Sequence, residues 1–508
     1  MTFQGTWGVG ATLRAGVVPR TFRRTCRVPA VTSEAAPLPV LRRAIVPLAL
    51  GVSIVVVPVP AGLTPSSWHF FALFSATIAA LVTEPLPSPV IGLLAVAIAA
   101  LLGLVAPDPA ASIRWALTGF SDSTVWLMFV VLMVALGYQK TGLGHRIALT
   151  LVERLGGRTL GLGYAVACAD LVLAPLTPSN TARAGGILFP IIRAIPALYG
   201  SSPGPTAHAL GAYLMWTSFA AMCVTSSMFL TALAPNLLAQ AMLKDIVRVH
   251  VTWGEWFVGF LPVGLVLFAL TPLLVYWLYP PTLRASAEVP QWARTELERL
   301  GGIKRSEVVM ALLVTVALAL WILGSAWVSP TTTALLVFCL MLLTGILTWD
   351  DVLGARQAWN ALVWFATLVT LADGLNRVGF LGWFAAGTVG ALAPLPVLGK
   401  MVGIVLAFFL AHYMFASLTA HTTALLPTFL AVVAASPDLP QRPLSLLLAY
   451  TLGLMGVLTP YATGSAPIYY ASGYITRWEF WRLGAIFGIV YLAVLLGLGL
   501  PYLVALTR

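Results

Sequence analysis

Long apolar runs follow one another along almost the whole chain. Continuous runs are expected as membrane spans at about 44–63, 66–83, 88–106, 123–138, 255–279, 307–328, 331–348, 358–373, 378–396, 443–458 and 481–506. An apolar run of about 18 residues or more can cross a bilayer as a helix. The runs do not alternate with period two, which argues against a transmembrane β-barrel. The pattern predicts an all-α polytopic membrane protein with about 11–13 spans.

Short hydroxyl-rich segments interrupt the apolar pattern in both halves of the chain. Residues 174–182 read APLTPSNTA and residues 416–424 read ASLTAHTTA, and a gapless alignment superimposes five identical positions. Residues 231–235 (TALAP) align in the same way with residues 463–467 (TGSAP). Matching polar breaks in two halves are typical of inverted-repeat transporters and indicate their binding site. We therefore expect two repeats, each with a re-entrant hairpin followed by a broken helix.

The charged residues divide the chain into segments. Residues 1–43 form a polar tail with seven arginines and one acid, Glu34. This tail is interpreted as an organelle transit peptide, a cytoplasmic tail or an over-long start. Residues 280–306 form the most charged internal loop, which we expect to be a cytoplasmic linker between a first half at 44–279 and a second half at 307–508. An amphipathic stretch at 139–158 predicts a helix lying along the membrane interface.

Composition excludes other classes of protein. Of the 508 residues 59% are hydrophobic and only 9% are charged, whereas about 25% are charged in soluble domains. The formal net charge is +11. The basic residues lie in short loops and in the tail, as the positive-inside rule expects, so nucleic acid is not an expected partner. The four cysteines are scattered and predict neither a metal site nor a disulfide framework.

The interruptions supply the candidate binding chemistry. A helix broken inside the membrane leaves free N–H groups at one end and free carbonyls at the other. The N–H ends attract carboxylates, and the carbonyl ends suit Na⁺. The candidate substrate-binding residues are Ser179, Asn180, Thr181, His421, Thr422, Thr423, Thr231, Pro235, Asn236, Thr463, Gly464 and Ser465. Ser179 and Asn180 are also a candidate Na⁺ site. The alternative is that the hydroxyls only cap helices or join neighbouring ones.

Several ionisable residues near the breaks have two interpretations each. His421 donates to a substrate carboxylate, or a neighbouring carbonyl satisfies it. For His412 we favour the structural interpretation. Arg183 meets an anionic substrate or extends to the interface. Asp170 and Asp373 bind a proton or a cation in one interpretation, although a structural role in a salt bridge is favoured for both.

Enzymatic function has little support in the sequence. HExxH, GxSxG and Walker A motifs do not occur, and no pair of carboxylates is placed for acid–base chemistry. A membrane enzyme using His421 or a serine remains an alternative. Duplicated broken helices favour alternating access around a central site over an open channel.

Seven segments together resemble one transporter family over residues 40–508. They are GLTPSSWHFFALF (62–74), GFSDSTVWLMF (119–129), KTGLGHRIAL (140–149), TPSNTARAGGILFP (177–190), TSSMFLTALAPNLLA (225–239), FASLTAHTTALLP (415–427) and TPYATGSAPIYYASGYI (459–475). The chain resembles the divalent anion:sodium symporter family, which includes dicarboxylate and citrate carriers. It most closely resembles the branch of bacterial citrate/succinate and tartrate/succinate exchangers and the plastid 2-oxoglutarate/malate translocator.

The resemblance implies a homodimer in which a transport domain moves against a scaffold domain, an elevator mechanism. It implies a di- or tricarboxylate substrate held between two hairpin tips, with no cofactor except Na⁺ as a coupling ion in some members. In sodium-coupled members each hairpin carries an SNT signature. Ser179, Asn180 and Thr181 match the first, whereas His421, Thr422 and Thr423 replace the second, which favours anion exchange.

Two other transport modes remain open, namely Na⁺-coupled dicarboxylate symport and symport of an inorganic divalent anion such as sulfate. The expected location is the bacterial plasma membrane, with the plastid inner envelope as the alternative.

Overall fold

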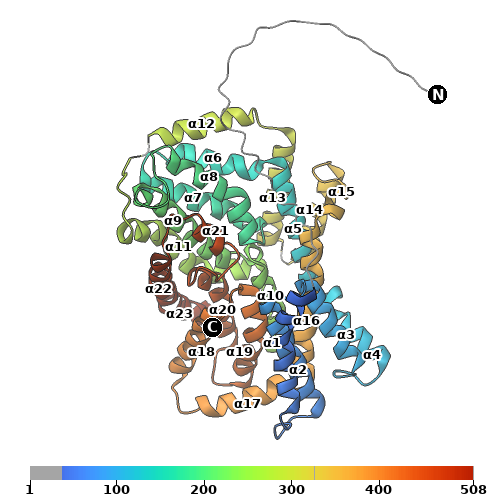
Figure 1. Ribbon diagram of the computed structural model, residues 1–508. Helices are drawn as coiled ribbons and strands as arrows, with labels where there is room; N and C mark the ends of the chain where they lie inside the picture. The colour runs from blue at the N-terminus through green and yellow to red at the C-terminus, as the bar shows by residue number, and fades with distance from the viewer. Residues whose placement is uncertain (1–36, 286, 325, 507–508) are drawn as a thin grey trace, which may run out of the picture.

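The fold consists of helices and their connections. The computed structural model describes residues 37–285, 287–324 and 326–506, and no strand occurs within these ranges. Figure 1 shows the arrangement of the helices, with the N-terminal ones, coloured blue, at the lower right. Most of the predicted N-terminal tail, residues 1–36, lies outside the described residues.

The helices follow the predicted spans and breaks, except that the first begins at Pro37, inside the predicted tail 1–43 and seven residues before the expected span 44–63. Those of the first half are α1 (Pro37–Val56), α2 (Pro65–Thr83), α3 (Ser88–Leu101), α4 (Pro109–Ala116), α5 (Ser123–Thr141), α6 (Leu143–Leu155), α7 (Thr159–Leu173), α8 (Phe189–Ala197), α9 (Gly211–Met228), α10 (Ala234–Met242) and α11 (Trp253–Leu278). After α12 (Glu288–Leu300) come α13 (Arg305–Leu323), α14 (Pro330–Leu343), α15 (Trp349–Gly354), α16 (Arg356–Arg377), α17 (Phe380–Leu392), α18 (Val397–Ala411), α19 (Leu418–Ala435), α20 (Gln441–Leu454), α21 (Ala466–Ala471), α22 (Arg477–Val494) and α23 (Leu500–Leu506).

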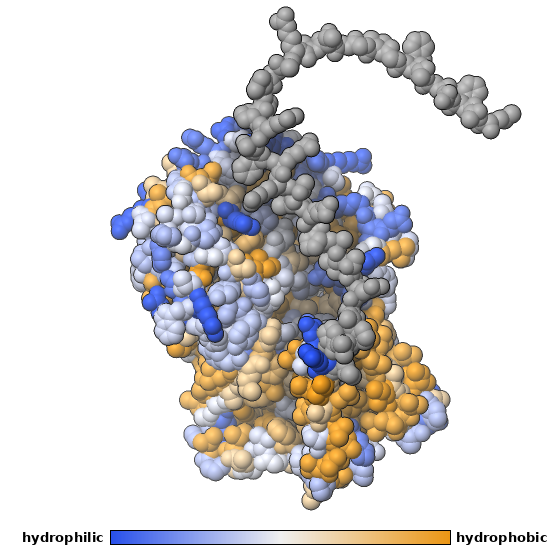
Figure 2. Space-filling view, viewed as in Figure 1, coloured by the Kyte–Doolittle hydropathy of each residue, from blue (hydrophilic) through white to orange (hydrophobic). Residues whose placement is uncertain are grey.

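Many of these helices are suited to a bilayer. Within the described ranges, nine helical segments are long and apolar enough to cross a membrane, and α3 and α14 are shorter apolar helices of 14 residues. Figure 2 shows apolar residues gathered over α1–α4, while polar residues cover the end that carries α12. The prediction of an all-α polytopic membrane protein is confirmed.

The two halves repeat one another with inverted direction. Helices α5 and α16 are antiparallel, because Gly119 before α5 donates its N–H to Thr370 Oγ1 near the end of α16 (3.0 Å). At the other end of α5, Lys140 pairs with Asp351, which lies just before α16. The hydrogen bond from Lys140 lowers the pKa of the Asp351 carboxyl to about 2. This pair lies at the end of α5 that leads into α6.

A glycine marks the same corner in each repeat. Helix α5 ends at Gly142 with φ 80°, and α16 is followed by Gly379 with φ 81°. A left-handed residue of this kind is nearly always glycine, because a Cβ would clash there. Each glycine starts the next helix, α6 or α17, and Figure 1 places these two helices at opposite ends of the molecule. The opposite placement is what an inverted repeat requires.

Helix α6 confirms the predicted amphipathic segment. Its buried face includes Ala148, Leu149 and Val152, and α12 packs over it. An ion pair of 2.9 Å between Arg146 and Glu307 ties α6 to the start of α13. The charged segment 280–306 therefore contains a helix that covers one end of the molecule.

Several predicted spans are shorter in the structure than the sequence suggested, among them α3 and α14 with 14 residues each. The segment 378–396 was expected to cross the membrane, but α17 has 13 residues. At 1.5 Å per residue it reaches about 20 Å, less than the roughly 30 Å of a bilayer core. It is the counterpart of amphipathic α6, and its apolar composition concealed that relation.

Candidate functional site

Two hairpin tips are built in the same way. In the first, α7 leads through a 3₁₀ turn (Ala174–Leu176) to a break at 177–179, after which the chain returns through α8. In the second, α18 leads through a 3₁₀ turn (His412–Met414) to a break at 415–417 and returns through α19. Ser179 Oγ accepts from the Ala182 N–H (3.1 Å), and Ser417 Oγ accepts from the Ala420 N–H (3.3 Å). A serine thus caps the returning helix in each hairpin.

These caps correct the register of the repeat. The counterpart of Ser179-Asn180-Thr181 is Ser417-Leu418-Thr419, four residues before the HTT that the gapless alignment chose. The gapless alignment matched Ser179-Asn180-Thr181 to residues of similar type that lie one helical turn further along α19. Thr422 and Thr423 instead donate to the carbonyls of Leu418 and Thr419, both at 2.8 Å. Their hydroxyls are engaged within α19 itself.

A cavity of about 280 Å³ lies between the two tips, and we call it the hairpin-tip cavity. The tips contribute residues 178–181 and 417–419, and the two later breaks contribute residues 233–235 and 463–464. Helices α5 and α16 close the opposite wall. Its lining contains hydroxyls, amides and apolar side chains, and none of its lining residues is charged.

The structure brings half of the predicted binding residues to this cavity and leaves the others outside its lining. Those that line it are Ser179, Asn180, Thr181, Pro235, Thr463 and Gly464. Those that do not are His421, Thr422, Thr423, Thr231, Asn236 and Ser465. The second group is buried in the surrounding protein.

Several of the excluded residues support the breaks. The Thr231 hydroxyl donates to the Pro175 carbonyl and accepts from the Trp253 indole N–H (3.0 Å). Asn236 Nδ2 donates to the carbonyls of Ser226 (2.7 Å) and Phe229 (3.1 Å). These bonds satisfy backbone groups that the breaks leave without helical partners. For these residues the alternative interpretation holds, in which the polar side chains support the structure rather than line the cavity.

Direct contacts join the first hairpin tip to both later breaks. Asn180 Nδ2 donates to Thr463 Oγ1 at 2.9 Å, and the Ala234 N–H donates to the Pro178 carbonyl at 2.9 Å. A Cβ on Gly464 would lie 2.5 Å from Thr181 Oγ1, so only glycine permits this close approach. The first tip and the TGSAP break therefore form one wall.

The electrostatics of the cavity come from backbone rather than from charged side chains. The first turn of α19 and the start of α10 both face it. The partial positive charge at helix N-termini attracts carboxylates. The hydroxyls of Ser179, Thr181 and Thr419 add neutral donors. The arrangement suits an anion with separated oxygen-rich ends.

Arg183 lies directly behind the first tip. It is 0% exposed and pairs with Asp170, itself 1% exposed, at 2.7 Å. Its Nη1 donates to the carbonyls of Thr177 (3.1 Å) and Ala232 (3.2 Å), one from each break. Both interpretations of Arg183, substrate contact and extension to the interface, are therefore wrong. The salt-bridged interpretation of Asp170 is confirmed, and Asp373 likewise pairs with Arg377 at 2.6 Å.

The second hairpin replaces this ion pair with aromatic rings. In the corrected register His421 is the counterpart of Arg183, and Phe408 is the counterpart of Asp170. Their ring centroids lie 4.5 Å apart. His421 is fully buried, and neither ring nitrogen has a hydrogen-bond partner among the described residues, so no carbonyl satisfies it. His412, by contrast, contacts the Ala462 carbonyl at 2.9 Å, as its structural interpretation predicted.

Sequence reasoning missed several lining residues. Met128 and Leu132 come from α5, while Gln357 and Trp364 come from α16. The Trp364 indole nitrogen is buried and has no hydrogen-bond partner within the described ranges. The repeat of Val125-Trp126 as Val363-Trp364 could have indicated that α16 faces the site. Ser417 and Thr419 required the corrected register.

The two hairpin registers make different predictions for serine and threonine in α19. Ser417→Ala removes a helix cap and should destabilise the protein by about 1 kcal/mol. It should also raise the KM for substrate, because Ser417 lines the cavity. Thr422→Ala, the matched control, should leave KM nearly unchanged. Thermal unfolding and transport kinetics of both variants check this, and a larger effect on KM from Thr422→Ala would restore the gapless register.

Comparison with known proteins places the chain in a family. The model of the sodium:sulfate symporter transmembrane region matches residues 40–507. The L-tartrate/succinate antiporters of Escherichia coli (strain K12) and Shigella sonnei (strain Ss046) are each 44% identical over 474 residues, covering 91% of this chain and 97% of the relative. The crystal structure of the Alcanivorax borkumensis YdaH transporter has a similar fold, with a TM-score of 0.51 at 17% identity, covering 83% of this chain and 97% of that one.

The family match and the relatives agree with the helical architecture. The apolar helices and the bacterial relatives identify a multi-pass protein of the bacterial inner membrane. The family and the relatives are transporters. The chain belongs to the sodium:sulfate symporter family of divalent anion transporters.

Proposed function

We propose that the chain is a secondary transporter that exchanges one dicarboxylate for another, with tartrate and succinate as the first substrates to test. The named activity of its relatives supports this substrate class. The cavity supports it as well, because two opposed tips present hydroxyls and helix starts to a small space. Dicarboxylates carry an anionic group at each end and could meet both tips. The chain is proposed to carry out no chemical step on its substrate.

The observation that carries the exchange mode is the position of Arg183. A Na⁺ site at the first tip would use the free carbonyls of the broken helices. Two such carbonyls, those of Thr177 and Ala232, accept hydrogen bonds from the Arg183 guanidinium. The group is held in place by Asp170. We propose that this fixed cation takes the place of a mobile one, so that Ser179 and Asn180 do not hold Na⁺. We propose that no Na⁺ couples to transport.

The inverted repeat supports a mechanism for the exchange. Residues 44–279 and 307–508 are proposed as the two halves, joined by a linker at 280–306. In each half one long helix, α5 or α16, faces the hairpin tips across the cavity. We propose that the hairpins move with the substrate past these helices, as an elevator, in a homodimer.

A counterflow experiment tests the proposed function. Purified protein in liposomes loaded with succinate should take up labelled tartrate or succinate saturably. Uptake should need the internal counter-substrate, and it should be the same with K⁺ or Na⁺ outside. Uptake into empty liposomes driven by a Na⁺ gradient would indicate symport instead. Competition by sulfate but not by succinate would indicate an inorganic substrate, and a chemically altered substrate would indicate an enzyme.

A further inference from the structure

A second cavity lies beside the start of α5, and we call it the α5 cavity. Its volume is about 280 Å³. Lys244 and His250 line it, together with hydroxyls from the first turn of α5 and from the start of α14. No aspartate or glutamate belongs to its lining. A cavity with cationic and hydroxyl groups and no carboxylate favours an anion.

The α5 cavity and the hairpin-tip cavity are lined by the same two helices, α5 and α10. On α5, Leu127 lines the first and Met128 the second. On α10, Gln240 lines the α5 cavity, while Ala234 and Pro235 line the hairpin-tip cavity. The two cavities therefore lie at successive positions along the seam between α5 and α10.

The α5 cavity lies at the end of α5 that is far from α12. Helix α5 begins at this cavity and ends at Thr141. There α6 begins, and α12 packs over α6. The basic segment around α12 marks the cytoplasmic side by the positive-inside rule. The α5 cavity accordingly faces the periplasm.

The charge of Lys244 is available to a ligand. The Lys244 ammonium makes no hydrogen bond or ion pair in the part of the chain that the structure describes, although Asp245 is its chain neighbour. Asp122 directly precedes Ser123, the first residue of α5 that lines the cavity. Its Oδ1 accepts hydrogen bonds from the N–H groups of Thr124 (2.8 Å) and Val125 (3.2 Å). No carboxylate of the described residues thus forms an ion pair with Lys244, although Asp245 lies close enough to interact with it electrostatically.

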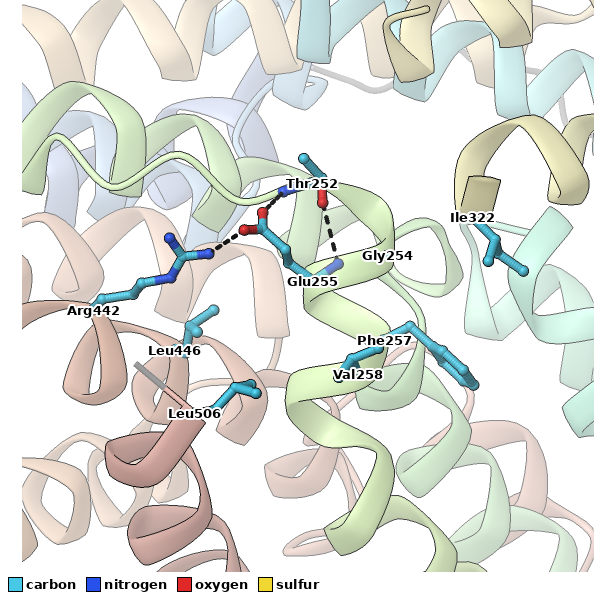
Figure 3. Close-up of a pocket in the computed structure, with 9 residues that line it drawn as sticks. All are labelled: Thr252, Gly254, Glu255, Phe257, Val258, Ile322, Arg442, Leu446 and Leu506. Atoms are coloured by element: carbon cyan, nitrogen blue, oxygen red, sulfur yellow. Dashed lines mark hydrogen bonds and ion pairs between the residues drawn. The ribbon is translucent and has the colours of Figure 1, made fainter. Parts of the chain in front are cut away.

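A neighbouring pocket shows the opposite situation. It has a volume of about 550 Å³ and shares Thr252 with the α5 cavity. Figure 3 shows its arginine, Arg442, directed at Glu255, which also bonds to Thr252. The Arg442–Glu255 ion pair is 2.5 Å long, and the remaining lining is largely apolar. This larger pocket has its cation already paired, so it does not select an anion.

We propose that the α5 cavity is a periplasmic capture site for divalent carboxylates, in which Lys244 attracts the anion before it reaches the hairpin tips. This inference rests on the proposed function, because the captured anion is the proposed substrate. A capture site raises the local concentration of substrate, so its loss affects KM more than the maximal rate. Its effect must also be confined to one side of the membrane.

Exchange kinetics in oriented vesicles test the capture site. Lys244→Gln should raise the KM for external succinate by about threefold to tenfold in right-side-out vesicles, with the maximal rate unchanged. In inside-out vesicles its KM should equal that of the wild type. The difference should shrink as KCl rises from about 0.1 M to about 1 M, because salt screens the charge. Lys244→Arg, which retains the charge, should stay within about twofold of the wild type.

Arg248→Asn is the matched control. It removes the same charge four residues further along the chain, outside the cavity lining, and asparagine tolerates the left-handed conformation of Arg248 (φ 59°). Its KM should not change. An unchanged KM for Lys244→Gln, an equal change in both vesicle orientations, or an equal effect of Arg248→Asn would each overturn the capture site. If the wild-type protein does not exchange carboxylates, the proposed function is wrong as well. If the wild-type protein is active and only the predictions for Lys244 fail, the capture site alone is wrong.

Discussion

Replacing Arg183 with alanine is expected to destabilise the protein by about 3–5 kcal/mol and to abolish exchange. The substitution leaves the Asp170 carboxylate buried without its partner. It also leaves the carbonyls of Thr177 and Ala232 without a donor. Thermal unfolding of the purified protein and the counterflow assay measure the two effects. Because both breaks lose a bond, the first tip should lose its shape even in molecules that remain folded.

Two companion variants separate charge from packing. Asp170→Asn combined with Arg183→Gln removes both charges together and should recover more than half of the lost stability without restoring exchange. Arg377→Ala breaks an ion pair of the same type whose arginine is 57% exposed, and it should cost about 1 kcal/mol or less. If Arg183→Ala is no more destabilising than Arg377→Ala, the buried pair does not hold the tip. If the double variant exchanges normally, Arg183 does not serve as the fixed cation.

Replacing Asn180 with alanine is expected to reduce the exchange rate by about 100-fold or more, the loss typical of a misplaced binding group. Asn180 lines the cavity and joins the first tip to Thr463 of the later break. Loss of one such bond should cost only about 1 kcal/mol of stability. The predicted result is therefore a stable protein with little exchange, measured by counterflow and by thermal unfolding.

An exposed asparagine supplies the control for Asn180. Asn360 lies on α16 beside the lining residue Ala361 but is itself exposed and outside the lining. Asn360→Ala should retain wild-type exchange. An active Asn180→Ala protein would show that the tip needs no link to Thr463, and it would remove Asn180 from the proposed contacts.

The sequence predicted the architecture well because hydrophobic length and polar breaks follow directly from the bilayer. Both hairpins, both later breaks and the amphipathic α6 are confirmed. The expected span at 378–396 extends beyond α17, just as those at 88–106 and 331–348 extend beyond α3 and α14, because the apolar sequence continues past the ends of these helices.

The site was predicted less completely than the fold. The first signature, Ser179 to Thr181, lines the cavity as expected. The second was displaced by one helical turn, because hydroxyl residues at 417, 419, 422 and 423 match the first copy almost equally well. Only the cap by Ser417 fixes the register. The partner of Arg183 was equally hidden, since the acid lies 13 positions earlier on the other arm of the hairpin.

The buried Arg183–Asp170 pair has a consequence for energetics across the membrane. A coupling ion that binds and leaves carries charge through the membrane potential, which acts on each elementary charge by about 2.3 kcal/mol per 100 mV. Arg183 is part of the chain and returns with the hairpin on every cycle. If one dianion leaves for each that enters, the charge moved in one direction equals the charge moved in the other. The carrier would then be electroneutral, and its direction would follow only the concentrations of its two substrates.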